Sequence, residues 1–353
     1  MVSILSAIIV IGILVLVHEF GHYVTAKYFN VKVLKFSIGF GPKIFGVKGK
    51  ETEYLISSVP LGGYVKLYGE DDKDEIFEER DRAFSTQSPL RKIAIVFAGP
   101  FFNFLFAFFV FFLINTIGYK TVSTKIGDVK EKYPAYNAGI KKDDRILKIN
   151  DISVKTWEDI SKIIKSKDGS ELTLEVQRNN QILIFKLKPV LESTKNIFGE
   201  DTKIPVLGII SSDELISISH PIHKSITRSF SQVYELTKMT LITIVKLIQR
   251  VIPVSSLGGP IMITKLAGET AKTGATSLIL FMALLSVNLA VLNLLPIPIL
   301  DGGHIILFSF ELITGKKVSE RFKEVYTYVG MFIIILLTIT VFYNDIMRVI
   351  LGK

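Results

Sequence analysis

Two histidines and a glutamate lie together near the start of this chain of 353 residues, in the sequence His18-Glu19-Phe20-Gly21-His22. On a helix, this H-E-x-x-H spacing places both imidazoles on one face, one turn apart. Imidazole nitrogens are common zinc ligands, and the glutamate beside the first histidine can take a proton from water at the metal. A chance match is rare in a chain with only five histidines. The pattern therefore favours a metal-dependent hydrolase over a polar pair packed at a helix end.

A catalytic zinc ion usually has three protein ligands and one open position, so the two histidines need a partner. The chain contains no cysteine, which leaves histidine or a carboxylate for this role. Asp301 is the leading candidate because it ends a long uncharged stretch and follows Pro296 and Pro298. These prolines break a helix and leave backbone groups unpaired, which a membrane protein tolerates mainly where the backbone lines a cavity. His304 is a possible substitute, although a supporting role is expected for it.

Two asparagines lie in apolar surroundings and have more than one possible role. Asn293 precedes Asp301 by about two helical turns and can either point its amide at the site or bridge two helices. Asn103 has the same two possibilities, and for this residue a packing role is favoured.

The elements that carry these residues are typical of a membrane protein. The chain is 49% hydrophobic, and its mean hydropathy is +0.42, which is high for a soluble protein. Four stretches reach or approach the roughly 20 apolar residues that cross a bilayer. They cover about 1–26, 93–119, 273–300 and 325–344. The first stretch is interpreted as a retained helix because it lacks the basic start of a signal peptide and carries the His-Glu-His cluster.

The basic residues next to these stretches predict an orientation. With four spans, nine of them fall on one side: Lys27, Lys32, Lys35, Arg91, Lys92, Lys316, Lys317, Arg321 and Lys323. The positive-inside rule makes this side cytoplasmic, and it places the active site toward it. It also accounts for the net charge of +9 without nucleic acid, so the lipid bilayer is the expected partner and nucleic acid is not.

The expected fold class is a polytopic α-helical membrane protein of about four spans, with a β-hairpin region and one inserted α+β domain. Alternating residues between glycines and prolines predict the hairpins. We expect a membrane core in two halves, at 1–119 and 273–353, with hairpins at 35–67 and an acidic loop at 70–81 in the first half. Between the halves we expect a small α+β domain at 121–190. A linker at 191–272 follows it and contains an interfacial amphipathic helix at about 225–251.

Several motifs occur in an order that identifies a resemblance. They are H-E-F-G-H at 18–22, G-F-G-P at 39–42, P-L-G-G-Y-V at 60–65, F-A-G-P-x-x-N at 97–103 and N-L-L-P-I-P-I-L-D-G-G-H at 293–304. Together they resemble the site-2 protease family of intramembrane zinc metalloproteases, in its bacterial regulator-of-sigma-E protease branch. The resemblance covers nearly the whole chain.

The resemblance implies roles for individual residues. His18, His22 and Asp301 would bind one Zn²⁺, Glu19 would be the catalytic acid and base, and Asn293 would help to hold substrate. Gly62, Gly63 and Tyr64 would belong to a membrane-dipping hairpin that pairs with the extended substrate.

The resemblance also implies the type and location of the inserted domain and the class of substrate. Residues 121–190 resemble a circularly permuted PDZ domain with 126–129 as its ligand-groove strand, and the domain would lie outside the cytoplasm. Asp143 and Asp151 replace glycines that are usual in its turns, which makes peptide binding by the groove less secure. The substrates would be single-span proteins of the bacterial inner membrane, trimmed first by another protease. Anti-sigma factors and remnant signal peptides are the types implied.

Other functions are compatible with parts of the pattern. One is a membrane zinc protease that acts on soluble or prenylated substrates and takes its third ligand from Glu269, Glu311 or Glu320. Another is a non-catalytic receptor or PDZ scaffold, or a metal transporter. The presence of Glu19 argues against a scaffold, and the lack of further acids within the spans argues against an ion path.

Overall fold

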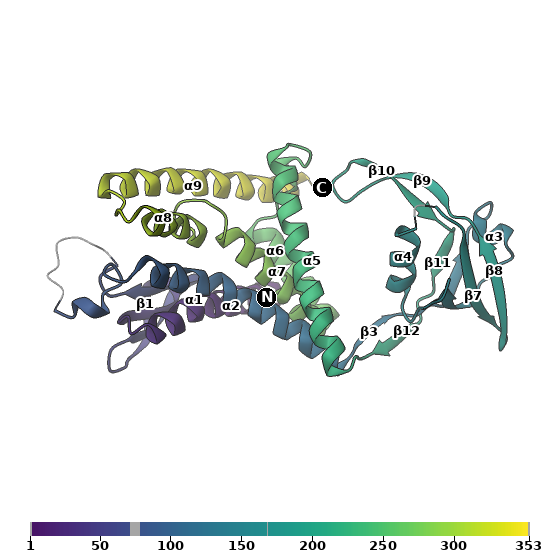
Figure 1. The fold of residues 1–353 in the computed structure, drawn as a ribbon, viewed down its shortest axis with the longest axis horizontal. Helices are drawn as coiled ribbons and strands as arrows, with labels where there is room; N and C mark the ends of the chain where they lie inside the picture. The colour runs from purple at the N-terminus through teal and green to yellow at the C-terminus, as the bar shows by residue number, and fades with distance from the viewer. Residues whose placement is uncertain (1, 71–77, 168, 352–353) are drawn as a thin grey trace. The chain divides into compact units, whose positions relative to one another are not determined.

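The computed structural model describes residues 2–70, 78–167 and 169–351, and its internal contacts divide the chain into two compact units (Figure 1). The first unit consists of Met1–Leu113, Ser225–Val245 and Pro253–Lys353, and the second of Ile114–Lys224 and Lys246–Ile252. Most of the acidic loop expected at 70–81 lies outside the described residues, since positions 71–77 are not among them.

Helices dominate the first unit. In chain order they are α1 (Val2–Tyr28), α2 (Pro89–Ile117), α5 (Ile222–Ile248), α6 (Pro260–Thr273), α7 (Ala275–Asn293), α8 (Asp301–Thr314) and α9 (Glu320–Leu351). Four of them, α1, α2, α7 and α9, are long and apolar enough to cross a membrane, each with a mean hydropathy of at least 2.2 in its best window. These helices confirm the four predicted spans.

The third span differs from its expected bounds of 273–300. Helix α6 ends at Thr273, α7 ends at Asn293, and residues 294–300 are not helical. Pro296 and Pro298 lack the N–H groups that a continuing helix needs, which explains the break. Asp301 therefore begins helix α8 instead of ending a span.

Strands β1 (Val33–Lys48) and β2 (Glu53–Leu67) form a hairpin that bends back on itself. As a result, Ile38 lies opposite both Ile56 and Gly63, and residues 35–38 have one segment of β2 on each edge. The last segment of β2, residues 63–67, pairs with β1 along one edge, and no strand of the described residues pairs with its other edge. This open edge faces the site described below.

The turn of the hairpin is attached to the end of α1 through Glu51. Its carboxylate accepts hydrogen bonds from Arg82 at 2.7 Å and from Lys27 at 2.8 Å. These two cations lower the pKa of Glu51 to about 2. Because the group is exposed, the attachment contributes little to stability and is weakened by salt.

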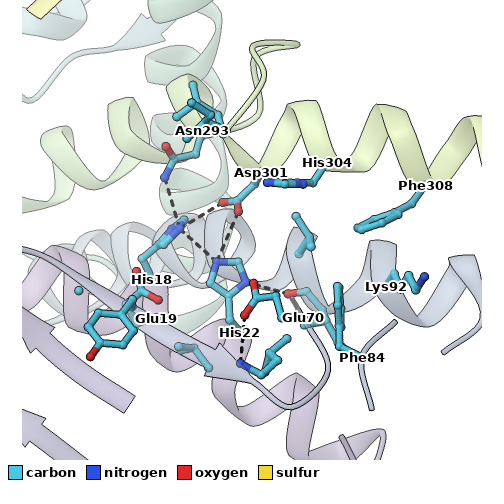
Figure 2. Close-up of a pocket in the computed structure, with 18 of the residues that line it drawn as sticks. His18, Glu19, His22, Glu70, Phe84, Lys92, Asn293, Asp301, His304 and Phe308 are labelled. Carbon is cyan, nitrogen blue, oxygen red and sulfur yellow. Dashed lines mark hydrogen bonds and ion pairs between the residues drawn. The ribbon is translucent and has the colours of Figure 1, made fainter. Parts of the chain in front are cut away.

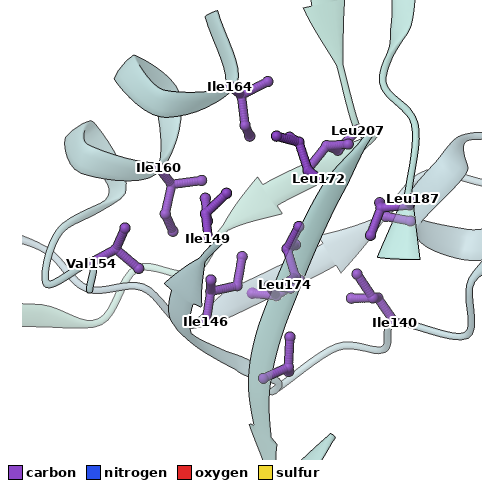
Figure 3. Close-up of a cluster of buried hydrophobic side chains, with 13 residues drawn as sticks. Ile140, Ile146, Ile149, Val154, Ile160, Ile164, Leu172, Leu174, Leu187 and Leu207 are labelled. Atoms are coloured by element: carbon purple, nitrogen blue, oxygen red, sulfur yellow. The ribbon is translucent and has the colours of Figure 1, made fainter. Parts of the chain in front are cut away.

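The second unit is a small α+β structure. Its strands are β3 (Tyr119–Val122), β4 (Ile126–Val129), β5 (Arg145–Ile149), β6 (Ile152–Ser153), β7 (Leu172–Arg178), β8 (Gln181–Leu187), β9 (Val190–Lys195), β10 (Asp201–Val206), β11 (Ile209–Ser211) and β12 (Leu215–Ile218), and its helices are α3 (Pro134–Asn137) and α4 (Trp157–Lys165). The largest sheet has the order β6-β5-β7-β8. Helix α4 places Ile160 and Ile164 in a core that includes Ile146 and Leu174 of this sheet (Figure 3).

Strand β4, for which a groove role is expected at residues 126–129, has partners on both edges at its first residue. On one edge it pairs with β11, with Ile209 opposite Val129. On the other edge the N–H of Ile126 donates to Asp144 at 2.8 Å, and its carbonyl accepts from Asp143 at 2.9 Å. A peptide that adds to this edge at Ile126 must displace these bonds, and the groove role of residues 126–129 stays a prediction. Asp143 has the left-handed conformation, with φ of 72°, that its place in the turn requires.

The chain enters and leaves the second unit through neighbouring strands. Strands β3 and β12 are antiparallel, with Tyr119 opposite Ile218. The domain expected at 121–190 lies within this unit, which also includes residues 191–224.

The carboxylate of Asp345 in α9 joins this helix to the start of α6. It accepts backbone hydrogen bonds from Gly259 at 3.0 Å, Ile261 at 2.9 Å and Met262 at 3.2 Å, and its side chain is 1% exposed. A carboxylate is favourable at this position because the N-terminus of a helix carries partial positive charge and unpaired N–H groups.

We predict that Asp345→Ala destabilises the protein by about 2 kcal/mol, because it leaves buried N–H groups unpaired. Thermal denaturation of the detergent-solubilised protein measures the change. Asp345→Asn keeps one acceptor and should lose less. A melting temperature unchanged in Asp345→Ala would contradict this account of α6 and α9.

Candidate metal centre

Three side chains from two helices converge on one point (Figure 2). His18 and His22 come from α1, and Asp301 comes from the first turn of α8. The two Nε2 atoms are 3.2 Å apart. His18 Nε2 lies 3.1 Å from Asp301 Oδ2, and His22 Nε2 lies 3.6 Å from Asp301 Oδ1. The sequence spacing placed these imidazoles together, and the fold adds the carboxylate.

This donor set fits a zinc ion. Ligands of a tetrahedral zinc, with bonds of about 2.0–2.1 Å, lie roughly 3.3 Å from one another, close to the separations observed here. Asp301 Oδ2 is buried and no donor makes a hydrogen bond to it in the described residues, so it is an acceptor that a cation would satisfy. Two imidazoles and one carboxylate also match the ligand types of catalytic zinc.

A hydrogen bond to α2 fixes the orientation of the His22 ring. Its Nδ1 lies 2.8 Å from the carbonyl oxygen of Ile95. A carbonyl can only accept, so Nδ1 carries the proton and donates it. The lone pair of Nε2 is then available on the side of Asp301.

Glycine residues allow α1 and α2 to approach closely enough for this arrangement. A Cβ atom on Gly21 would lie 2.3 Å from the carbonyl oxygen of Ala98. A Cβ atom on Gly99 would lie 2.3 Å from His22 Nε2 and 2.8 Å from His18 Cε1. Gly99 therefore leaves the space that the two imidazoles occupy.

The segment that delivers Asp301 is strained and closely packed. Ile299 has a φ of 80°, which is costly for a β-branched residue and is found mainly where the surrounding structure serves a function. A Cβ on Gly302 would lie 2.3 Å from the carbonyl oxygen of Leu294, and one on Gly303 would lie 2.4 Å from that of Ile297. These glycines let the start of α8 lie directly on the broken segment.

Glu19 lies beside the three convergent groups, in the same cavity of about 700 Å³. Its carboxylate interacts with the backbone N–H of Val65 in the last segment of β2. Gly63 makes this contact possible, because a Cβ there would lie 3.0 Å from Glu19 Cγ and 2.9 Å from Val15. The open edge of the hairpin and the candidate base are therefore in direct contact.

The remaining predicted residues also line this cavity. Gly62, Gly63 and Tyr64 form part of its wall, and the amide nitrogen of Asn293 lies 3.4 Å from His18 Nε2. His304 lines the cavity but is not in the three-residue group.

The proposed alternative third ligands are not in this group either. Among the described residues, the group that could hold a metal contains Asp301 and none of Glu269, Glu311 and Glu320. Glu311 lines the same cavity, where its carboxylate accepts from the backbone N–H of Val318.

Lys92, which from the sequence is only one of the charges that predict orientation, is part of the cavity wall (Figure 2). Its ammonium group lies 5.3 Å from the ring centre of Phe308 and 5.9 Å from that of Phe84, and the residue is 7% exposed. The signal in the sequence was a lysine followed by a long uncharged stretch, which does not reveal the two rings.

Comparisons with known proteins agree with this geometry. The sequence model of peptidase family M50 matches residues 6–337. A candidate zinc metalloprotease of Campylobacter jejuni is 38% identical over 350 residues, which cover 99% of this chain and 94% of that protein. One of Rickettsia conorii is 38% identical over 354 residues, 98% and 99% of the two chains. The zinc metalloprotease RasP of Oceanobacillus iheyensis is 27% identical over 429 aligned positions, 99% and 100% of the two chains.

A membrane-type helical fold with an H-E-x-x-H helix and a convergent aspartate defines the class as a membrane zinc metalloprotease. The chain belongs to peptidase family M50, the site-2 protease family. Its cofactor is accordingly Zn²⁺.

We predict that Gly99→Ala weakens zinc binding by about 10- to 100-fold, the range typical of changes to residues that hold metal ligands in place. The new methyl group would occupy the position of the imidazole of His22. Zinc affinity is measured on purified protein by competition with a chelator. Gly12→Ala in α1 is the matched control, because its Cβ would meet no atom within 4 Å. Equal affinity in the two variants would show that the site tolerates the methyl group.

Proposed function

We propose that this protein hydrolyses a peptide bond within the transmembrane segment of other membrane proteins. The observation that carries the proposal is the contact between Glu19 and the open edge of β2 at Val65, beside a metal-binding group on membrane-type helices. This arrangement places a base next to backbone groups that can hold an extended peptide.

In this proposal His18, His22 and Asp301 hold the zinc ion. The bound ion would polarise the carbonyl of the scissile bond and make water more acidic. Glu19 accepts the proton of the attacking water and donates it to the leaving amine. The amide nitrogen of Asn293, 3.4 Å from His18 Nε2, would donate a hydrogen bond to the carbonyl oxygen of the substrate as negative charge develops on it.

A transmembrane helix protects its peptide bonds by its own hydrogen bonds, so the substrate must unwind locally. The backbone groups freed in this way need partners, and addition to a strand edge supplies them. Residues 63–65 of β2 are available for this pairing. At Gly62, φ of 150° and the ring of Phe40, 2.0 Å from a Cβ built there, favour glycine where the chain turns into this edge.

The location follows from charge and from the relatives. The basic flanks of the spans favour a cytoplasmic side for the active site, and the similar proteins are bacterial. We therefore infer a multi-pass protein of the bacterial cytoplasmic membrane with its second unit outside the cytoplasm. Its substrates would be single-span proteins such as anti-sigma factors or remnant signal peptides.

The second unit, a PDZ-like domain in this proposal, would act as a size filter. It would hinder substrates whose external part has not been removed by another protease. A passive spacer is the alternative, and the two can be separated by deletion.

We predict that Glu19→Gln lowers cleavage of a reconstituted transmembrane substrate by at least about 10²-fold, because general acid–base catalysis contributes 10²–10⁴-fold. Its zinc content should stay near that of the wild type. Asp301→Ala should lose zinc as well as activity, whereas Glu311→Ala should keep zinc. Cleavage in proteoliposomes and metal analysis measure the two properties. Cleavage by Glu19→Gln at the wild-type rate would overturn the proposed mechanism.

We predict that replacing residues 120–217 by a short Gly/Ser linker allows cleavage of substrates that retain their external domain. The new ends, Tyr119 and Ile218, are paired in the intact protein, so a short linker can join them. Cleavage of trimmed and untrimmed substrates is compared in the same vesicles, with zinc content as the control for folding. If the deletion variant discriminates as the intact protein does, the second unit is not the filter.

A further inference from the structure

Asn103 of α2 contacts the Nδ1 atom of His18, whereas the Nε2 atom of the same ring faces His22 and Asp301. It is fully buried, with 0% exposure, and its amide nitrogen lies 3.2 Å from His18 Nδ1. Its side-chain oxygen Oδ1 is also buried and has no hydrogen-bond partner in the described residues. The backbone carbonyl of the same residue accepts a hydrogen bond from Ser286 at 2.8 Å.

The chemistry of a zinc ligand determines what Nδ1 of His18 must do. A neutral imidazole carries one proton, so an Nε2 that offers its lone pair to a metal requires the proton on Nδ1. That N–H needs an acceptor, and an amide nitrogen cannot be one. A half-turn of the Asn103 carboxamide exchanges its two nearly isosteric ends. The exchange pairs the Oδ1 atom with the Nδ1–H of His18, and the amide nitrogen takes the former place of Oδ1.

We propose that Asn103 is a positioning residue of the metal centre: its side-chain carbonyl accepts the Nδ1–H of His18 and holds the Nε2 lone pair toward the zinc ion. This proposal rests on the proposed function of His18 as a ligand. It assigns to Asn103 more than the packing role favoured from the sequence. Asn103 would do for His18 what the carbonyl of Ile95 does for His22.

A packing role and a positioning role predict opposite results for two substitutions. Asn103→Leu keeps the volume but removes the acceptor, whereas Asn103→Asp keeps an acceptor of the same shape. If the residue only fills space, leucine is tolerated and a buried carboxylate is harmful. If it positions His18, leucine is harmful and aspartate is tolerated, because carboxylates commonly accept the second N–H of zinc-binding histidines.

The experiment measures zinc affinity by chelator competition on the full-length protein in detergent, together with the visible spectrum of the Co²⁺-loaded form. For Asn103→Leu, we expect a loss of affinity of about 10- to 100-fold and a changed Co²⁺ spectrum. Asn103→Asp should bind zinc at least as tightly as the wild type. Ser286→Ala, which removes only the bond to the backbone carbonyl of Asn103, is the control and should leave both readouts unchanged.

Wild-type affinity in Asn103→Leu, or a loss in Asn103→Asp equal to that in Asn103→Leu, would overturn the proposal. If Asn103→Leu does not fold, Asn103→Asp alone tests the proposal. A tenfold loss of zinc affinity in Asn103→Asp would show that Asn103 does not act as an acceptor for His18. His18→Ala serves as the reference for the centre itself. If His18→Ala keeps its zinc, the proposed metal centre is wrong, and if it loses zinc while Asn103→Leu keeps it, only the role of Asn103 is wrong.

Discussion

The convergence of three donor atoms within a few ångströms is the constraint on which the rest of the membrane core depends. Spacing along α1 brings two of them together, but Asp301 lies 279 positions after His22 and must be delivered by the fold. The proline break before α8, the strained backbone of Ile299 and the glycines at the start of α8 all serve this delivery. A carboxylate with an unpaired oxygen is costly in such apolar surroundings, so a bound cation would stabilise this cluster.

The parts of the site that could be predicted from sequence are those set by local spacing or by composition. The H-E-x-x-H helix needs only the period of a helix, the four spans need only apolar length, and the absence of cysteine pointed to a carboxylate partner. The start of α8 at Asp301, the doubling of residues 35–38 between two segments of β2 and the two rings around Lys92 depend on contacts between distant residues. No local pattern encodes these contacts. The turn that covers the second edge of β4 at Ile126 also comes later in the chain, so no local pattern at 126–129 could show it.

The hairpin also connects the metal centre to recognition. An edge strand is normally a hazard because its unpaired backbone attracts other chains. Here the open edge lies beside Glu19, and in the proposed function it would bind an extended substrate. Gly63 is the residue that allows the strand and helix α1 to touch. In the proposed function, peptide binding and acid–base chemistry would therefore depend on the same close contact.

The antiparallel pairing of β3 with β12 has a consequence for how this chain can vary. The second unit begins and ends at adjacent points. It therefore connects the helices before and after it as a short closed loop would, whatever its internal length. The entropy of closing a loop grows only slowly with the number of residues in it, and a paired base removes most of even that dependence. The unit can therefore be enlarged, duplicated or exchanged over generations with little thermodynamic effect on the helices that hold the zinc ion.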